Sequence, residues 1–376
     1  MSRAAVICEF NPFHNGHKFL LEKIKSTCAD EIVCIMSGGF VQRGDIAVVN
    51  KYERAKAALL NGADLVVELP TAYAVSSARV FARNGVRIAR SLSCDMLCFG
   101  AESELCVLEK IVDAIEDNSV KELIKRKSST GLYYPKALEE AVEEVCGKEL
   151  SAWMSLPNNI LAIEYIRSCR EAGITPVAFE RKGVSHDSSI PSGDIASASA
   201  IRQMIQKGED YARYTPMTIK DPAALSAIES AVIYTLKCRS AQEISALSEV
   251  SEGLENRILD AAQRYNSIEE ILEAVKTKRY THARLRRIMI YSLLGVTASI
   301  QNTPVPYLRI LGVREGKEHL LKDAALPLVA KVKADYEALN NSSKEIFDLD
   351  IRATHAMNLV RNESINEFSE GIIKIK

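Results

Sequence analysis

The feature that most constrains the fold of this chain is the alternation of short apolar runs with helical patterns over its first two hundred residues. Five runs have the length and composition of strands: Ala4–Phe10, Glu31–Met36, Asp64–Leu69, Asp95–Phe99 and Ile174–Phe179. Helical periodicity is found in Gly16–Thr27, Lys51–Asn61, Ser77–Ser91 and Ser199–Lys207. Strands separated by helices of this length need crossover connections, which predicts βαβ units and a mostly parallel sheet. In such sheets ligands bind beyond the carboxyl ends of the strands.

The rest of the chain departs from this alternation. Residues 102–156 contain helical segments and a turn at Gly131–Pro135, which indicates a helical insertion. After about Tyr211 the pattern is helical, in Ala223–Leu236, Ala241–Leu247, Glu255–Ala262, Ile268–Val275 and His282–Leu294, and one strand-like segment, Tyr307–Val313, follows. At roughly 100–200 residues per domain, the 376 residues predict two domains. We expect an α/β domain over residues 1–210 and a mainly helical domain over 211–376.

The charge balance and the cysteines limit which partners, metal sites and cellular compartments we expect for this protein. The 48 basic and 49 acidic side chains give a net charge of −1, so an RNA partner would need a local basic patch. The nine cysteines are scattered in apolar surroundings, as in a reducing compartment. Cys94 and Cys98 are not followed by a second pair of zinc-site spacing, so we expect no metal site. Without a signal-peptide pattern or an apolar run of membrane-spanning length, the sequence predicts a cytoplasmic protein with no membrane partner.

The strongest chemical signal is the HxGH motif in Asn11–His17, between the first strand and the first helix. It places His14 in the loop and His17 in the first helical turn. A helix N-terminus supplies unpaired N–H groups and positive potential for phosphate. Gly16 has no Cβ and lets the backbone approach a nucleotide. The alternative is two surface histidines at a helix cap.

A second signal lies late in the α/β region. Ser197-Ala198-Ser199-Ala200-Ile201-Arg202 begins a helix with two hydroxyls and, one turn on, an arginine. Hydroxyls, free N–H groups and a guanidinium form an anion site at a helix start. The alternative is an ordinary N-cap with a surface arginine.

Together the two motifs resemble the HxGH nucleotidyltransferase superfamily, whose second motif reads like ISSTxIR and whose fold is a Rossmann-like sheet. Ser199 stands where threonine is common and keeps the hydroxyl. Within the superfamily the chain resembles the bacterial tRNA(Met) cytidine acetate ligase family. That resemblance rests on Glu9–His17, Ser37–Gly44, Leu65–Pro70, Pro157–Leu161 and Ile195–Arg202, and continues more weakly in Thr277–Thr281 and Pro306–Leu311.

The resemblance implies an ATP-dependent ligase that activates acetate as acetyl-adenylate and acetylates the wobble cytidine of elongator tRNA(Met) at its exocyclic amine. It implies catalytic roles for His14 and His17 on the phosphates, and for Ser199 and Arg202 on the pyrophosphate side. The ATP-binding residues implied are Ile7, Cys8, Glu9, Phe10, Asn11, Pro12, Phe13, His14, Asn15, Gly16, His17, Lys18, Phe19, Leu20, Gly100, Asn159 and Arg181. Mg²⁺ is expected as the counter-ion of ATP, with no evident protein ligand.

RNA contacts are expected from two basic regions. Arg43 and Lys51 follow the second strand and suit an acetate or RNA contact. The segment Lys276–Arg287 is basic, and its Tyr280 could stack on an unpaired base. The RNA-binding residues predicted there are Lys278, Arg279, Arg284, Arg286 and Arg287. The alternative is a solvated helix face, and the positions 279, 286 and 287 do not share one face.

Two other functions stay open at this point. One is a small-molecule adenylyltransferase acting on a substrate such as nicotinamide mononucleotide or phosphopantetheine, although such a site would need only about 160–200 residues. The other is a non-catalytic RNA-binding protein with a retained nucleotide pocket. The intact histidines, Gly16, Ser199 and Arg202 favour an enzyme over the latter.

Overall fold

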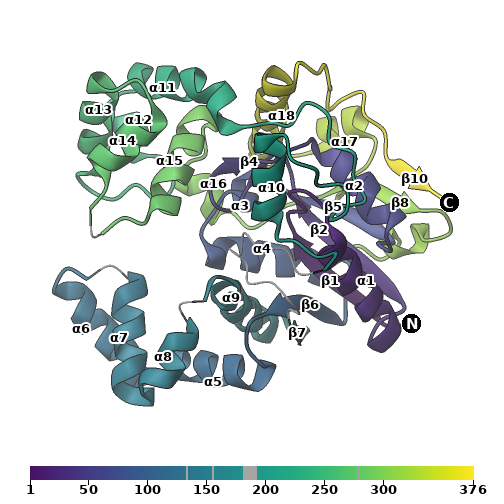
Figure 1. The fold of residues 1–376 in the computed structure, drawn as a ribbon, viewed down its shortest axis with the longest axis horizontal. Coiled ribbons are helices and arrows are strands. Elements are labelled where there is room, and N and C mark those ends of the chain that lie inside the picture. Colours follow the sequence, from purple (N-terminus) through teal and green to yellow (C-terminus); the bar gives the residue numbers. More distant parts are fainter. Residues whose placement is uncertain (133, 155, 181–192, 278) are drawn as a thin grey trace.

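In the computed structural model, which describes residues 1–376 except 133, 155, 181–192 and 278, one sheet forms the centre of the molecule. Five strands run parallel in the order β5-β2-β1-β6-β7 (Figure 1). They are β1 (Arg3–Cys8), β2 (Glu31–Ser37), β5 (Leu65–Leu69), β6 (Met96–Ala101) and β7 (Thr175–Glu180). All five coincide with the strands predicted from the sequence, so the parallel α/β fold is confirmed.

The two faces of the sheet are covered by different helices because successive strand residues point to opposite sides. In β1, Ala4, Val6 and Cys8 pack with residues of α1 (Asn15–Thr27) and α2 (Lys51–Leu60). Ala5 and Ile7 instead pack with residues of α4 (Ala78–Ser91) and α9 (Pro157–Ala172). Both faces of the strands are therefore buried, which explains their continuously apolar sequences.

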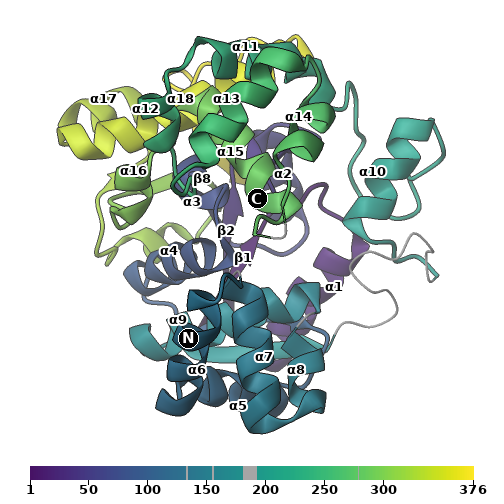
Figure 2. The same cartoon turned by 90° about the vertical axis from the view of Figure 1, so that its left-hand side faces the viewer.

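Two groups of helices flank the carboxyl edge of the sheet. The insertion contains α5 (Leu105–Glu116), α6 (Asn118–Ser129), α7 (Tyr134–Cys146) and α8 (Lys148–Met154). The helical segment contains η1 (Leu225–Ile228), α11 (Glu229–Cys238), α12 (Ala241–Ser245), α13 (Leu254–Arg264), α14 (Ile268–Val275), α15 (His282–Leu294) and α16 (Ala298–Asn302). Figure 2 shows β1 and β2 between these groups, with α10 (Ala198–Lys207) to one side and α4 to the other.

The last seventy residues return to the sheet, which the prediction of a separate C-terminal domain did not include. Strand β8 (Leu308–Arg314) pairs antiparallel with β5, and β9 (Leu328–Val329) and β10 (Ile373–Ile375) pair with β8. The remaining elements are the short hairpin β3 (Phe40–Val41) and β4 (Asp45–Ile46), and the helices α3 (Thr71–Ala74), η2 (Glu318–Leu321), α17 (Val332–Ala338) and α18 (Asn341–Arg361). The helical character predicted beyond residue 211 thus applies to the helical segment, while the residues after 306 complete the central sheet. Among the residues that the structure describes, none of the helices has the length and apolarity needed to cross a membrane.

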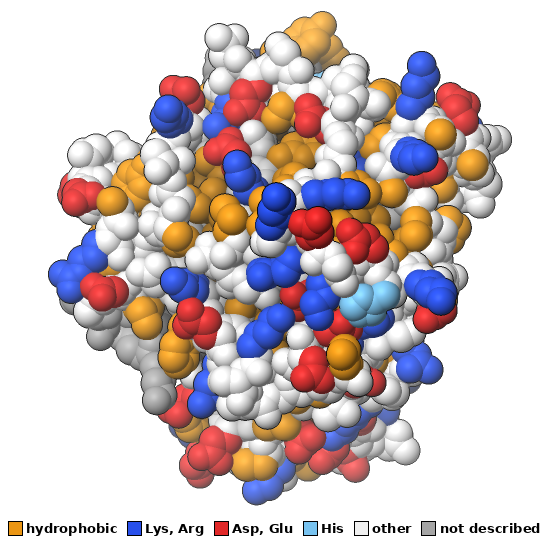
Figure 3. All heavy atoms as spheres, turned by 90° about the vertical axis from the view of Figure 1, so that its right-hand side faces the viewer, with side chains coloured by type: hydrophobic (Ala, Val, Ile, Leu, Met, Phe, Trp, Pro, Cys, Tyr) orange, Lys and Arg blue, Asp and Glu red, His pale blue; other side chains and the backbone are white. Residues whose placement is uncertain are grey.

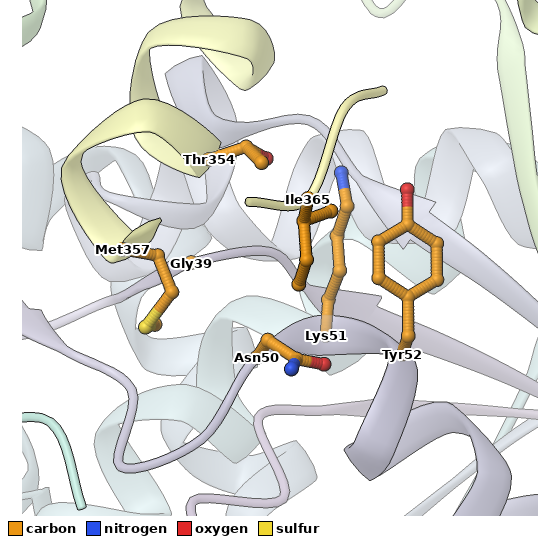
Figure 4. A pocket seen from close by; sticks show the side chains of 7 residues that line it. All are labelled: Gly39, Asn50, Lys51, Tyr52, Thr354, Met357 and Ile365. Carbon is orange, nitrogen blue, oxygen red and sulfur yellow. The ribbon is translucent and has the colours of Figure 1, made fainter. Parts of the chain in front are cut away.

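A buried ionic cluster joins this returning segment to the first half of the chain. The Lys51 ammonium is 4% exposed and lies 2.7 Å from the carboxylates of both Glu68 and Glu367. Glu367 also lies 3.6 Å from the buried guanidinium of Arg309 on β8. Figure 4 shows Lys51 and Tyr52 side by side beneath the segment that carries Ile365. The cavity that these residues line measures about 10 Å³, close to the size of one water molecule.

The expectation that Lys51 contacts RNA is therefore wrong, because its ammonium is buried and paired with Glu68 and Glu367. Asp350 lies nearby and accepts hydrogen bonds from the Thr71 N–H (2.7 Å) and the Tyr307 hydroxyl (3.0 Å). Together with Glu68 and Glu367, it gives the cluster more acidic than basic side chains. Burial, together with repulsion from Asp350 and Glu367, raises the pKa of Glu68 to about 7, although Lys51 opposes the shift.

We predict that Lys51→Met lowers the free energy of unfolding by about 3–5 kcal/mol, because it leaves buried carboxylates without their cation. Lys56→Met is the matched control, since Lys56 is exposed on the same helix and should change stability by less than about 0.5 kcal/mol. Chemical denaturation of both variants measures the difference. Equal unfolding midpoints for the two variants would contradict the structural role assigned to Lys51.

Candidate active site

The HxGH loop connects β1 to α1, and its two histidines are held by backbone hydrogen bonds. The Gly16 N–H donates to His14 Nδ1 (3.1 Å), and the His14 N–H donates to His17 Nδ1 (3.2 Å). The two rings stack with centroids 3.6 Å apart and an interplanar angle of 24°. Because each Nδ1 accepts a hydrogen bond, the neutral form of each ring carries its proton on Nε2. Both histidines can therefore donate from Nε2 to an anionic ligand.

Aromatic packing and a glycine set the positions of these rings. Phe10 and Phe13 contact the His17 ring at centroid distances of 4.9 and 5.6 Å. A Cβ on Gly16 would lie 2.9 Å from the His14 ring, so only glycine fits beneath it. His14 itself is 4% exposed and forms the N-cap of α1, so the cap and the proposed ligand contact use different nitrogens of one ring. The alternative of a helix cap is thus correct for His14, but His14 is buried and not a surface histidine.

The second motif contacts the first directly. Arg202 on α10 donates from Nη1 to the carbonyl of Asn11 (2.7 Å). Ser197 caps α10 by accepting from the Ala200 N–H (3.0 Å), and its hydroxyl lies 3.0 Å from that of Ser199. The fold therefore brings the two motifs together through Arg202, although they come from opposite ends of the α/β region.

Further hydrogen bonds fix the HxGH loop from outside. Asn15 donates from its side-chain amide to the carbonyls of Asp194 (2.8 Å) and Arg213 (2.9 Å). The Thr215 hydroxyl donates to the Phe13 carbonyl (2.5 Å), and Asn11 accepts from the Val48 N–H (2.8 Å). The loop is thus tied to the chain on both sides of α10 and to the segment before α2. We expect this to restrict its movement.

Arg202 lies in a mixed electrostatic environment. Burial lowers the pKa of its guanidinium, while Asp45 and Glu9 raise it and Arg43 lowers it further. Glu9 accepts a hydrogen bond from the Gln42 N–H (2.7 Å), which connects the end of β1 to the β3–β4 hairpin. The carboxyl edge therefore gathers cations and carboxylates around the HxGH loop and the start of α10.

A residue of this edge that the sequence analysis missed is Arg54, which supports the edge through backbone contacts. Its side chain is fully buried and donates to the carbonyls of Glu9 (2.6 Å), Ser37 (3.0 Å) and Gly38. Burial lowers its pKa to about 10. Arg54 thereby holds together the ends of β1 and β2, between which ligands bind in such folds. The spacing of Arg54 in the sequence could have indicated this burial. Arg54 and Lys51 lie on the same face of α2 as the apolar residues Ala55 and Ala58.

The other expected ATP contacts fall into different classes. The side chains of Ile7 and Cys8 lie in the cores on the two faces of the sheet, so only their backbone faces the edge. Lys18 and Phe19 are exposed, Leu20 and Pro12 are more enclosed, and Gly100 pairs with Phe179 within the sheet.

Asn159 is fully buried, and its amide binds the Glu102 N–H (3.1 Å), the Ser103 hydroxyl (2.8 Å) and the Trp153 carbonyl (2.9 Å). The Asn159 side chain thus positions the loop after β6. Arg181 lies outside the described residues.

The residues predicted to bind RNA separate in the structure. Arg287 is buried and lies 2.7 Å from the Glu249 carboxylate, which corrects its assignment as an RNA contact. Arg284 donates to the Glu249 carbonyl and lies 5.0 Å from the centre of the Tyr280 ring. Arg279 is exposed, and its guanidinium approaches Gly131 in the insertion. Lys278 lies outside the described residues.

Three exposed or half-exposed side chains in this region have the residue types of metal ligands. Glu269, Glu273 and His282 place one ligand atom each within 4.8 Å of one another. Glu273 is already paired with Lys276 (3.3 Å) and His282 (3.1 Å). We therefore read the group as a surface ion-pair network.

The β3–β4 hairpin brings Arg43 to α15. Gly44, at the hairpin turn, has φ +73°, and a Cβ there would lie 2.6 Å from the backbone nitrogen of Arg287. The backbones of the hairpin and of α15 are thus in direct contact beside Arg286. Arg43 is exposed at the same turn. Part of the predicted basic segment therefore reaches the edge of the sheet that carries the HxGH motif.

These features define a class of protein. A parallel sheet with an HxGH loop at its carboxyl edge and an arginine from a late helix beside it is the arrangement of a HIGH nucleotidyl transferase, and the family model of that description matches residues 1–370. The tRNA(Met) cytidine acetate ligase of Thermoanaerobacter sp. is 37% identical over the full length of both chains. That of Clostridium acetobutylicum is 34% identical, covering all of this chain and 99% of the relative. The chain belongs to the tRNA(Met) cytidine acetate ligase family.

Solved structures agree with this membership. Thermotoga maritima TmcAL in its apo form superimposes with a TM-score of 0.92 at 27% identity, with both chains fully covered. A second crystal form of that protein, bound with alpha-thio ATP, gives a TM-score of 0.90. The similarity extends over the insertion, the helical segment and the returning strands.

We predict that Gly44→Ala destabilises the protein more than Gly208→Ala. Both glycines have left-handed backbone angles, φ +73° and +70°, but nothing lies within 4 Å of a Cβ at Gly208. Gly208→Ala should cost about 1–2 kcal/mol from backbone strain alone. Gly44→Ala should cost a further 1–3 kcal/mol, roughly, from the clash with α15. Denaturant unfolding compares the variants, and equal losses would argue against contact between hairpin and helix.

Proposed function

We propose that this protein is an ATP-dependent ligase that acetylates the N4 amine of the wobble cytidine of elongator tRNA(Met). The observation that carries the proposal is the stacked histidine pair with both Nε2 donors at the carboxyl edge of the sheet, beside Arg202. Membership of a family whose relatives carry this name over their full length supports it. The alpha-thio ATP bound to the Thermotoga maritima protein supports ATP as the nucleotide.

In the first step, an oxygen of acetate attacks the α-phosphorus of ATP, the bond to the β-phosphate oxygen breaks, and pyrophosphate leaves. Charge increases on the phosphate oxygens during this step, and preorganised donors stabilise it. His14 and His17 donate from Nε2 to these oxygens. Ser199 and Arg202 stabilise the departing pyrophosphate. Mg²⁺ arrives as the counter-ion of ATP and is part of the substrate.

In the second step, the cytidine amine attacks the acetyl carbonyl of the adenylate. A C–N bond forms, the bond from the acetyl carbon to the phosphate oxygen breaks, AMP leaves, and the amine loses a proton. The target base has to reach the carboxyl edge in an unstacked state, as single-stranded RNA loops allow. Arg43 at the hairpin and Arg279 between the helical segment and the insertion are exposed cations suited to the adjoining phosphates. The nine free cysteines support a cytoplasmic location.

The alternative functions account for less of the chain. A small-molecule adenylyltransferase gives no role to the insertion and the helical segment, which the ligase relatives match over their full length. A non-catalytic RNA-binding protein gives no role to the two ordered histidines and their bonds. Both alternatives predict that acetate has no effect on the chemistry of ATP.

We predict that the protein catalyses acetate-dependent exchange of labelled pyrophosphate into ATP without tRNA. His14→Ala and His17→Ala should each slow this exchange about 100- to 1000-fold, the effect of removing one preorganised donor. His14→Ala should also cost about 1 kcal/mol of stability because it removes the N-cap of α1. Lys23→Ala, an exposed position further along the same helix, is the control and should exchange normally. Exchange that persists without acetate would exclude an acetyl-adenylate.

A second prediction concerns RNA. Arg279→Glu should weaken tRNA binding and reduce the slope of log affinity against log salt by about 0.7 or more, because a phosphate contact releases fewer counterions when its cation is lost. Pyrophosphate exchange should be unchanged. Arg264→Glu, an exposed charge reversal on α13, is the control. If both variants bind tRNA with the wild-type salt slope, Arg279 is a solvated side chain.

A further inference from the structure

The exposed face of α4 carries a row of arginines that the HxGH chemistry does not use. Arg79, Arg83, Arg87 and Arg90 are all exposed, while the positions between them are mostly buried against the sheet and α9. At a rise of 1.5 Å per residue, the row extends over about 16 Å along the helix axis. A helix covering a sheet needs a polar outer face, but α4 has only arginine at the fully exposed positions of that face.

Three of these arginines line a groove of about 760 Å³ on this side of the molecule. Arg83, Arg87 and Arg90 form one wall, and the end of α9 contributes Ser168 and Glu171. Glu171 is the one acidic side chain among the residues lining it. The groove thus has a net positive charge from its arginines, and its lining also includes apolar side chains such as Pro304 and Leu326.

Among the described residues, the carboxylates near this row pair with its first arginine. Arg79 lies 3.7 Å from Glu164 and 4.0 Å from Glu171, both weak contacts at the start of the helix. Arg87 donates to the Val305 carbonyl (3.2 Å), which orients it without cancelling its charge. Within the part of the chain that the structure describes, Arg83, Arg87 and Arg90 have no acidic partner within 4.0 Å. On the face shown in Figure 3, by contrast, Lys and Arg side chains are interspersed with Asp and Glu.

The row begins at the edge of the sheet that carries the candidate active site. Ser76, two residues before α4, accepts a hydrogen bond through its carbonyl from the Gln42 side chain (2.8 Å) of the β3–β4 hairpin. At its other end, α4 reaches the amino edge, where the Leu92 carbonyl accepts from Arg3 at the start of β1. A polyanion extending from the active-site edge along this side of the sheet would meet the arginines in succession.

We propose that the groove along α4 binds the sugar–phosphate backbone of the substrate RNA, at nucleotides outside the one that reacts. The proposal rests on the proposed tRNA ligase function and names a second surface for the same partner. A linear set of guanidinium groups matches a chain of phosphates, because arginine binds phosphate through two parallel N–H donors. A mononucleotide would use only part of a row of this length. The surface adds affinity and orientation without reading the sequence.

The test is an Arg83→Gln/Arg90→Gln double variant of the full chain, which removes two charges and leaves Arg87 and its hydrogen bond in place. The matched control is Lys23→Gln/Lys56→Gln, which removes two exposed charges from α1 and α2 on the other face of the sheet. Binding of an elongator tRNA(Met) transcript is measured as a function of salt concentration. Acetate-dependent pyrophosphate exchange, measured without tRNA, reports on the catalytic site independently.

We expect the arginine double variant to reduce the slope of log affinity against log salt by about 1.4 to 1.8, or 0.7 to 0.9 for each lost contact. Its pyrophosphate exchange should equal that of wild type, and the control should keep the wild-type slope. A wild-type slope in the arginine variant, or an equal loss in the control, would overturn the proposal. If exchange is absent from wild type while the arginine variant alone loses RNA affinity, the groove stands and the proposed chemistry falls.

Discussion

The buried ammonium of Lys51 is the contact on which the arrangement of this protein depends most. It bonds to Glu68 at the end of a central strand and to Glu367 near the chain terminus, so one cation fixes segments that are distant in sequence. A buried ion pair has to recover a large desolvation cost, and it does so only when its geometry is complete. On the next turn of the same helix, Arg54 binds the carbonyls at the ends of β1 and β2. Helix α2 thus uses two buried cations to shape the edge where the HxGH loop begins.

That arrangement explains why the positions of the His14 and His17 rings are closely defined. The backbone beneath them supplies one hydrogen bond to each Nδ1, and Gly16 leaves space for the His14 ring. The direction in which each ring presents Nε2 is therefore a property of the loop backbone. The loop in turn depends on Arg202, Asn15 and Thr215 for its outer contacts. Sequence motifs far apart in the chain act here as one hydrogen-bonded unit.

The sequence predicted the parts of this structure that depend on local pattern. The five parallel strands, the helices between them and the HxGH loop all follow from periodicity and turn residues, which report short-range geometry. Partners of charged residues are different, because they are chosen by tertiary contacts. Lys51 and Arg287 look like RNA-binding cations in a linear sequence, and both are buried against carboxylates. The antiparallel pairing of β8 with β5 could not be predicted either, because the sequence of a single strand after many helices does not identify the strand with which it pairs.

The place of β8 has a consequence for how the chain is made. Synthesis proceeds from the N-terminus, so β1, β2, β5, β6 and β7 leave the ribosome before the strand that covers β5 exists. During that interval β5 is an open edge with an apolar sequence, which is a template for pairing with other chains. A nascent chain interrupted before residue 308 would contain the HxGH loop and the helix that carries Arg202, yet lack the strands that cover β5. Truncation before β8 would therefore leave a strand edge that favours pairing between chains.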